Sequence, residues 1–199
     1  MKPTSRVSGT MLPLRRSDVD TDQIIPSDWL KKVERTGFGE GLFSEWREDP
    51  AFRELLERHA GARVLVAGPN FGTGSSREHA VWAIQDYGFE AVVSPKFADI
   101  FRNNAVKCGL VPVELPTEAV ERLWQEAEHN PTTEVSIDVE EGVVSLPDGW
   151  SCRFDLDEGT RRRLVEGLDD IALTLLHEAE ISDHERRRPA WMPRVIPVT

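Results

Sequence analysis

Residues 63–87 have the sequence RVLVAGPNFGTGSSREHAVWAIQDY, in which a short apolar run is followed by a glycine-rich turn and an amphipathic segment. The run at 63–67 is apolar, partly β-branched and ended by a Gly-Pro pair, which is typical of a buried strand. We expect a helix to begin at Ser75 or Ser76, where a hydroxyl can cap it, and to end before Gly88. This order of elements predicts an α/β fold.

Similar units follow on the carboxyl side of this segment. Strands are expected at 91–94 and 110–115, and helices at 97–108 and 117–128. Pro112 predicts a sheet edge or a strand end for its segment, since proline donates no ladder hydrogen bond. The remaining expected elements are short strands at 134–140, 143–146 and 150–156, and one long helix from Asp157 toward Glu185.

The amino-terminal part has weaker signals. Residues 6–14 have a faint strand pattern, and 51–59 form a helix after Asp49-Pro50. Between them, glycines alternate with Phe38 and Phe43, which predicts a mobile loop. We expect one domain at 1–185 and a basic, proline-containing tail at 186–199.

Composition limits the function classes. The chain has 199 residues, a formal net charge of −11, 39% hydrophobic residues and two cysteines. That length suits one compact domain, and the acidic balance makes nucleic-acid binding an unfavoured function. No apolar run reaches the roughly 18 residues of a membrane helix, and residues 1–13 lack the apolar core of a secretion signal. We therefore expect a cytoplasmic protein.

The turn before the expected helix has the features of an anion site. A helix start leaves backbone N–H groups unpaired and carries a positive dipole, and Arg77 adds a guanidinium. The turn lacks the lysine of a P-loop and does not fit GxGxxG, so a carboxylate is favoured over a phosphate. Ser75 is then a candidate base. The structural alternative is that Ser75 only caps the helix, in a capping box with Glu78.

Three motifs resemble those of the aconitase-superfamily swivelling domain. They are NFGTGSSREHA at 70–80, DVDTDQIIP at 18–26 and FADIFRNNA at 97–105. Their order and spacing, and the length of the chain, are similar to those of the isopropylmalate dehydratase small-subunit family. The resemblance covers about residues 5–190. It implies a three-layered β/β/α domain and the interconversion of 2- and 3-isopropylmalate by dehydration and rehydration, a step of leucine biosynthesis.

The resemblance also implies roles for residues of the turn. Ser75 would be the catalytic base that removes the carbon-bound proton of the substrate, and Arg77 would bind a substrate carboxylate. Ser76 belongs to the same hydroxyl pair, and Thr73 and Gly74 complete the substrate-binding turn. The family places a [4Fe–4S] cluster in a large-subunit partner. Two cysteines cannot hold such a cluster, so we expect no cofactor and no metal in this chain.

Substrate choice in the family depends on a short stretch that corresponds to residues 29–32. Leu30 is the predicted contact for the isopropyl group, with Trp29 beside it, although core packing is the alternative for both. Arg35 is the nearest cation for a third carboxylate. We expect residues 36–39 to become ordered when the large subunit binds.

Two other function classes stay open at this point. One is a related hydro-lyase, acting on homoaconitate or on citraconate and methylmalate, and the other is a non-catalytic carboxylate-binding module. Among the lesser signals, His79 is expected to have a structural role. Cys108 is expected to be a small buried residue at a helix end, and Trp191 in the tail weakly suggests a surface that a partner covers.

Overall fold

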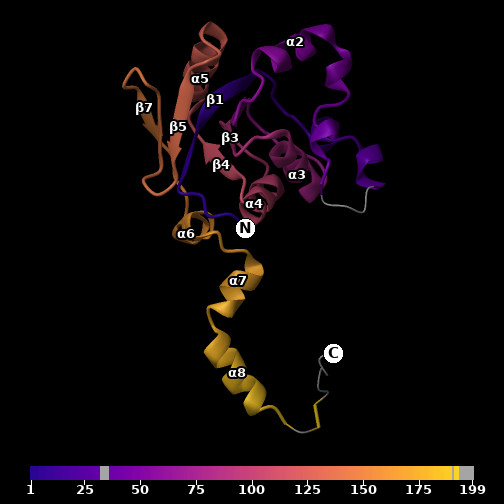
Figure 1. Ribbon diagram of the computed structural model, residues 1–199, viewed down its shortest axis with the longest axis vertical. Helices are drawn as coiled ribbons and strands as arrows, with labels where there is room; N and C mark the ends of the chain where they lie inside the picture. Colours follow the sequence, from indigo (N-terminus) through magenta and orange to yellow (C-terminus); the bar gives the residue numbers. More distant parts are fainter. Residues whose placement is uncertain (32–35, 190, 193–199) are drawn as a thin grey trace.

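The computed structural model describes residues 1–31, 36–189 and 191–192. Its body is one curved sheet with helices on both sides, and its last helices extend away from that body (Figure 1). Seven strands form the sheet in the order β4-β3-β2-β1-β5-β6-β7. Their bounds are β1 Arg6–Leu14, β2 Val64–Ala67, β3 Ala91–Ser94, β4 Val111–Glu114, β5 Glu134–Asp138, β6 Val143–Ser145 and β7 Ser151–Arg153.

Strand β1 pairs in two different ways with its two neighbours in the sheet. Its second half pairs in parallel with β2, starting at Met11 opposite Val64, whereas its first half pairs antiparallel with β5. Burial follows the same division, because side chains alternate between buried and partly exposed over the first half and are all buried from Met11 to Leu14. Strands covered on both faces are continuously apolar, whereas half-exposed strands alternate. This change of period explains the faint pattern in the sequence.

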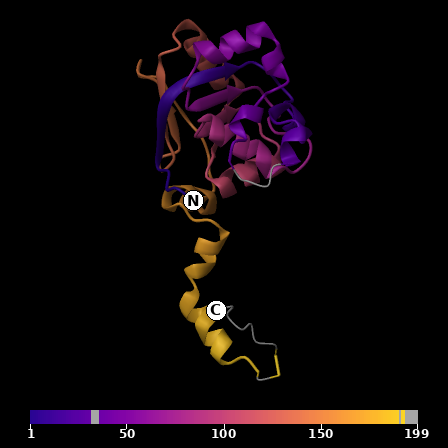
Figure 2. The ribbon, with the colours of Figure 1, turned by 45° about the vertical axis from the view of Figure 1, so that its right-hand side comes forward.

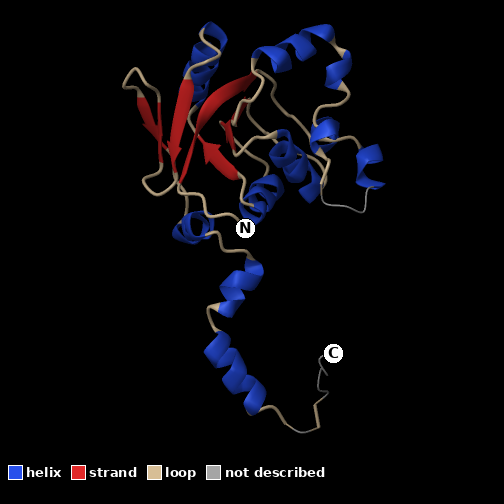
Figure 3. Ribbon diagram, viewed as in Figure 1, coloured by secondary structure: helices blue, strands red, loops and turns tan. Residues whose placement is uncertain are grey.

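The helices have the following bounds: α1 Thr21–Ile24, η1 Ser27–Lys31, η2 Gly39–Gly41, η3 Trp46–Glu48, α2 Pro50–Arg58, α3 Glu78–Tyr87, α4 Asp99–Cys108, α5 Thr117–His129, α6 Glu158–Glu166, α7 Asp170–Leu175 and α8 Glu178–Arg186. Helices α3 and α4 lie on the opposite side of the parallel strands from α5 (Figure 3). Among the described helices, none is long and apolar enough to cross a membrane.

Two apolar cores separate these three layers. Leu65 and Val92 face one core with α2, α3 and α4, whereas Val66 and Val93 face the other core with α5. Successive side chains of a strand point to opposite faces, so a continuously apolar strand can serve both cores. The prediction of a three-layered α/β domain is confirmed, and β4 with Pro112 lies at the sheet edge as expected.

Two predictions about local structure are wrong. The glycine-containing segment at 37–43 is not a mobile loop, because Phe38 and Phe43 are fully buried. The backbone N–H of Phe38 donates to Asp86 of α3 at 3.0 Å, and the guanidinium of Arg47 donates to the Gly39 carbonyl at 3.1 Å. The expectation that residues 36–39 become ordered when the large subunit binds stays a prediction, although Phe38 itself is buried in the core.

The expected long helix after Asp157 is three helices. Gly167 adopts the left-handed conformation with φ of 70° and ends α6, and Asp169 accepts a hydrogen bond from Ala172 as the N-cap of α7. A left-handed glycine followed by a capping aspartate ends one helix and starts another. The domain limit at residue 185 stays a prediction, although α7 and α8 leave the body from residue 170 onward (Figure 2).

His59 gives the fold a specific pH dependence. It follows α2, is 4% exposed, and its Nδ1 has no hydrogen-bond partner among the described residues. Burial is the main cause that lowers the pKa of His59 below its ordinary value. The unfolded chain therefore binds a proton at a higher pH than the folded chain does, and folding loses stability as pH falls below about 6.5.

We expect the free energy of unfolding to decrease between pH 7.5 and 5.5, and His59→Gln to make that decrease smaller. The aspartates whose pKa is lowered, such as Asp138 and Asp157, affect stability at more acidic pH. Urea denaturation of both proteins at several pH values measures this. Parallel curves for the two proteins would refute the role of His59.

Candidate functional site

The three sequence motifs form one structural unit at the carboxyl ends of β1, β2 and β3. The backbone N–H of Gly72 donates to the Val19 carbonyl at 2.7 Å, and that of Thr21 donates to the Thr73 carbonyl at 2.9 Å. On the other side, the N–H of Ala98 in the third motif donates to the Phe71 carbonyl at 3.0 Å. The turn after β2 is thus held between the other two motifs. The carboxyl edge of parallel strands is where α/β proteins usually bind ligands.

Glycine is required at the centre of this turn. Gly72 has φ of 80°, and a Cβ there would lie 2.2 Å from Cγ of Phe101, which belongs to the third motif. Gly74 has φ of 92° and passes Oγ1 of Thr21 closely. Left-handed backbone and close approach both favour a residue without a side chain. The two glycines therefore allow the first and third motifs to pack against the turn.

The helix begins later than expected. Helix α3 starts at Glu78 with Arg77 as its N-cap, and no side chain caps it. The predicted capping role of Ser75 or Ser76, and the capping box with Glu78, are therefore wrong. The cause is a tertiary contact: Oγ1 of Thr21 donates to the Ser75 carbonyl at 3.2 Å and holds Ser75 in the turn.

Ser75 and Ser76 are both exposed, and among the described residues no hydrogen bond engages either hydroxyl. The backbone of Ser75 is nevertheless fixed through its carbonyl. An exposed hydroxyl on a fixed backbone can meet a ligand that arrives from outside the chain. The alternative in which Ser75 serves only to cap the helix is thereby removed.

Arg77 lies beside this pair and forms an ion pair with Asp22 of α1. The Arg77 side chain is 19% exposed, whereas Asp22 is 57% exposed. Helix α1 is itself fixed by a capping box in which Asp20 accepts from the N–H of Gln23 at 2.8 Å. A guanidinium has five N–H donors, so one carboxylate leaves others for a second anion.

Sequence reasoning misses Asp22 and Thr21 as parts of this site. Aspartates in a turn commonly bond local backbone, and Asp20 does so. Asp22 instead points its carboxylate to Arg77, which is 55 residues away in the chain. The alternation of aspartates around Thr21 contains no signal that distinguishes these two roles. Only the need of a half-buried guanidinium for a counter-ion could have indicated Asp22.

The residues of the predicted specificity stretch are only partly placed. Trp29 and Leu30 lie in η1, and both are half-buried. The Trp29 ring packs on the first core and lies against Gly41, where a Cβ would be 2.7 Å from Cδ2 of the ring. Trp29 thus fits core packing, and its contact with a substrate stays a prediction, as does that of Leu30. Lys32 and Arg35 lie outside the described residues.

Thr73 and His79 have mainly structural surroundings. Thr73 is half-buried, with both its N–H and its carbonyl engaged by the first motif, and Gly74 is exposed. The His79 ring lies edge-on to Phe38 at 5.3 Å between centroids and next to Trp82 at 4.7 Å. These ring contacts pack His79 against the segment at 37–43, and its structural role stays a prediction.

The two cysteines lie on different elements. Cys108 ends α4 and is half-buried against the first core, which agrees with its expected role, and Cys152 lies in β7. Burial raises the pKa of the Cys152 thiol, so the thiolate is disfavoured there. The described residues contain no group of three or more His, Cys, Asp or Glu side chains that could hold a metal ion.

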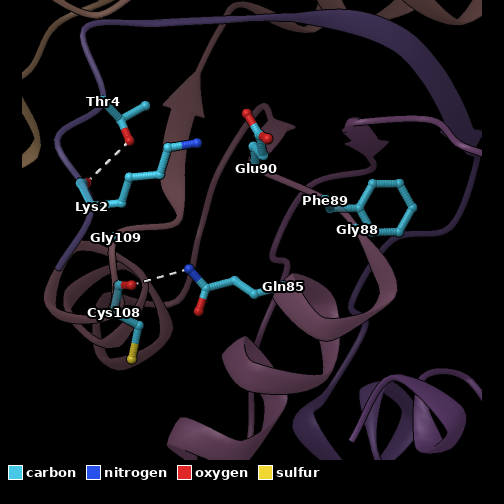
Figure 4. A pocket seen from close by; sticks show the side chains of 8 residues that line it. All are labelled: Lys2, Thr4, Gln85, Gly88, Phe89, Glu90, Cys108 and Gly109. Carbon is cyan, nitrogen blue, oxygen red and sulfur yellow. Dashed lines mark hydrogen bonds between the residues drawn. The ribbon is translucent and has the colours of Figure 1, made fainter. Parts of the chain in front are cut away.

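A cavity of about 250 Å³ lies at the opposite, amino end of the parallel strands (Figure 4). Two of its polar groups are engaged with neighbours: Gln85 donates to the Cys108 carbonyl at 3.0 Å, and Glu90 pairs with Arg63 at 2.5 Å. It contains none of the predicted site residues. The turn at 70–77 remains the candidate active site.

Family models, a solved structure and curated relatives match this chain. Residues 1–118 match a family model described as the aconitase C-terminal domain, and residues 121–158 match one described as LeuD_N. Residues 170–197 match a model of the C-terminal domain of 3-isopropylmalate dehydratase small subunits. The fold resembles a crystal structure of 3-isopropylmalate dehydratase from Methanocaldococcus jannaschii. The TM-score is 0.67 at 27% identity, and the match covers 89% of this chain and 98% of that one.

Two curated relatives are similar along nearly their whole length. The 3-isopropylmalate dehydratase small subunit of Parafrankia sp. is 61% identical over 94% of this chain and 95% of the relative. The small subunit of Rubrobacter xylanophilus is 56% identical over 98% of this chain and the whole of the relative. Since both similarities extend over almost the full length of both proteins, the chain belongs to the family of 3-isopropylmalate dehydratase small subunits.

Proposed function

We propose that this chain is the small subunit of a hydro-lyase that interconverts 2-isopropylmalate and 3-isopropylmalate in leucine biosynthesis, and that it acts only in complex with a large subunit. The observation that carries the proposal is the turn at 70–77. It presents the exposed Ser75 two residues before Arg77, whose guanidinium pairs with Asp22, and the other two motifs hold the turn by backbone hydrogen bonds. A cytoplasmic location fits this biosynthetic role.

Each residue of the turn has a proposed task. Ser75 takes the carbon-bound proton from the position next to a substrate carboxylate, and Arg77 binds that carboxylate while negative charge develops on it. Preorganised donors at developing charge are usually the largest single contribution to such catalysis. Ser76 and the backbone of Thr73 and Gly74 complete the contacts. A serine hydroxyl does not ionise unaided, so this role requires N–H donors and the Arg77 guanidinium to stabilise the alkoxide form that accepts the substrate proton.

We propose that the [4Fe–4S] cluster lies in the large subunit. Cluster ligands are normally cysteine thiolates, and the two cysteines of this chain lie on α4 and β7, with the Cys152 thiolate disfavoured by burial. The donor set of this chain therefore does not fit a cluster. When bound to the partner, the cluster would supply a Lewis acid for the leaving hydroxyl.

Specificity for the isopropyl group is proposed to come from η1. Leu30 is half-buried in η1, the helix that follows α1, and α1 contains Asp22. We expect Leu30→Arg to reduce kcat/KM for isopropylmalate by about 10-fold or more, because a charge replaces an apolar contact of about 1–3 kcal/mol. Competition assays with isopropylmalate and homoaconitate measure the preference. An unchanged preference would show that this stretch does not select the substrate.

The test of the proposed function is reconstitution. The chain is purified with a candidate 3-isopropylmalate dehydratase large subunit under anaerobic conditions, and isomerisation of isopropylmalate is assayed. Turnover only in the presence of both chains supports the proposal. A stable complex that turns over homoaconitate or methylmalate instead would assign a related hydro-lyase. Binding of dicarboxylates without turnover of any of them would leave a non-catalytic module.

A further inference from the structure

Strongly exposed apolar side chains are concentrated in the carboxyl-terminal segment. Five large apolar side chains of the described residues are strongly exposed, and four of them lie between residues 171 and 191. Ile171 is 72% exposed, Leu175 57% and Leu176 53%, and Trp191 is 78% exposed. Single exposed apolar residues are normal, but contiguous ones mark interaction sites.

Two of these side chains share a face of α7, and a third lies at the end of that helix. Ile171 and Leu175 are four residues apart in α7 and therefore lie on the same face, and Leu176 follows directly. The start of this helix is fixed to the body: Asp170 pairs with Arg163 of α6 at 2.6 Å and with Lys107 of α4 at 3.9 Å. The apolar face of α7 is thus held in position although the arm formed by α7 and α8 extends away from the body (Figure 2).

A hollow lies between this face and helix α3, which begins directly after the proposed active-site turn. About 460 Å³ in volume, it is bounded by Asp169, Asp170 and Ile171 of the arm and by residues of α3 and α4. The α3 residues are Glu78, Trp82 and Gln85, whose spacing places them on one face of that helix. Glu78 directly follows Arg77, so the surface continues from the active-site turn along α3 to the arm.

The family comparisons indicate which partner this surface fits. The model of the aconitase C-terminal domain ends at residue 118, whereas the segment at 170–197 matches a model specific to the small subunit. A C-terminal domain is joined covalently to the rest of its enzyme, but a separate small subunit must dock by contacts alone. The added segment bears the unburied apolar side chains, which is where such contacts are needed.

We propose that the face formed by Ile171, Leu175 and Leu176, together with the α3 side of the hollow, docks the large subunit. This rests on the proposed function, because the large subunit must already cover the turn at 75–77 to bring its substrate there. One partner surface that begins at the turn reaches the arm by following α3, whose ten residues span about 15 Å. The arm then anchors the partner at the end of α3 that lies away from the active-site turn, without touching the substrate.

The test uses the whole chain and the purified large subunit. In the variant Ile171→Lys/Leu175→Lys, we expect the Kd for the large subunit to rise at least about 10-fold, since two apolar contacts are replaced by charges. Both side chains are exposed, so the fold is not perturbed. The matched control, Gln125→Lys/Ser151→Lys, adds the same charge at exposed positions of α5 and β7 and should leave the Kd unchanged. Sedimentation of the isolated chain is measured in parallel.

Two results would support a docking role for the arm. One is a Kd that rises in the arm variant but not in the control variant, and the other is a kcat of the arm variant that returns to the wild-type value at saturating large subunit. An unchanged Kd in the arm variant would overturn the proposal. It would also be overturned if the isolated chain self-associates and the arm variant abolishes only that association, because the occupant would then be a second copy. A wild-type complex that forms but does not turn over isopropylmalate would refute the proposed function alone. Failure of the wild-type chain to bind at all would refute both.

Discussion

Ser75→Ala in the reconstituted complex is expected to lower kcat by about 10²–10⁴-fold, the usual contribution of a positioned general base. The substitution removes the exposed hydroxyl and leaves the turn intact, because the carbonyl of Ser75 still accepts from Thr21 and the neighbouring turn is held by Gly72 and Thr73. KM and the affinity for the large subunit should therefore change little. A loss in kcat alone is the signature of an interaction made only in the transition state.

Initial rates at saturating isopropylmalate measure this effect, and exchange of the substrate carbon-bound proton in D₂O measures the proton step directly. Ser151→Ala, which alters an exposed serine of β7 far from the turn, is the control and should keep full activity. Ser76→Ala should lose less than Ser75→Ala, since its proposed task is binding. If Ser75→Ala retained full turnover and proton exchange, another group would have to be the base.

The elements with strong local signals can be predicted from sequence. Strand β2 is a four-residue apolar run buried on both faces, and α3 ends at Gly88, which adopts the left-handed conformation with φ of 119°. The carboxyl end of α4 at Gly109 follows the same rule. In each case the physical cause lies in a few adjacent residues, so a single sequence is enough to find it.

The errors occur where distant segments decide the conformation. The start of α3 moves from Ser75 to Glu78 because Thr21, more than 50 residues earlier, holds the Ser75 carbonyl. The segment at 37–43 is packed against the body because Phe38 contacts the rings of His79 and Trp82 in α3. The glycine content of a segment indicates conformational freedom. It does not indicate whether the aromatic side chains beside the glycines are buried in a core. Tertiary contacts override local preference in both cases.

The candidate site can be predicted only in part. The motifs indicate Ser75 and Arg77 as site residues, and Arg77 is held by an ion pair with Asp22. The catalytic roles of Ser75 and Arg77 stay predictions. The carboxylate that holds the guanidinium escapes prediction, because it depends on how α1 lies across the turn. Capping by Asp20 and ion pairing by Asp22 differ only in where each side chain points, and the sequence does not encode this locally.

Replacing Arg77 is expected to affect both binding and catalysis. Arg77→Lys keeps the charge but loses the planar set of donors that matches a carboxylate, so we expect kcat/KM to fall by about 10²–10³-fold, with a higher KM and a lower kcat. Arg77 binds the substrate carboxylate in the ground state and more strongly when charge develops there. Steady-state kinetics of the reconstituted complex separate the two parameters, and the affinity for the large subunit serves as the control for folding.

We expect Asp22 to act through Arg77. The variant Asp22→Asn, compared with Arg77→Lys, tests this. The ion pair holds the guanidinium of Arg77, whose side chain is 19% exposed, against α1. Without the carboxylate the cation remains but is less well oriented, so we expect kcat to fall about 10-fold with little change in KM. If Asp22 only orients Arg77, adding Asp22→Asn to Arg77→Lys should cost almost nothing further, because residues that act as one unit are not additive. Full additivity of the two losses would show that Asp22 has a separate role, and that the guanidinium does not depend on it for its position.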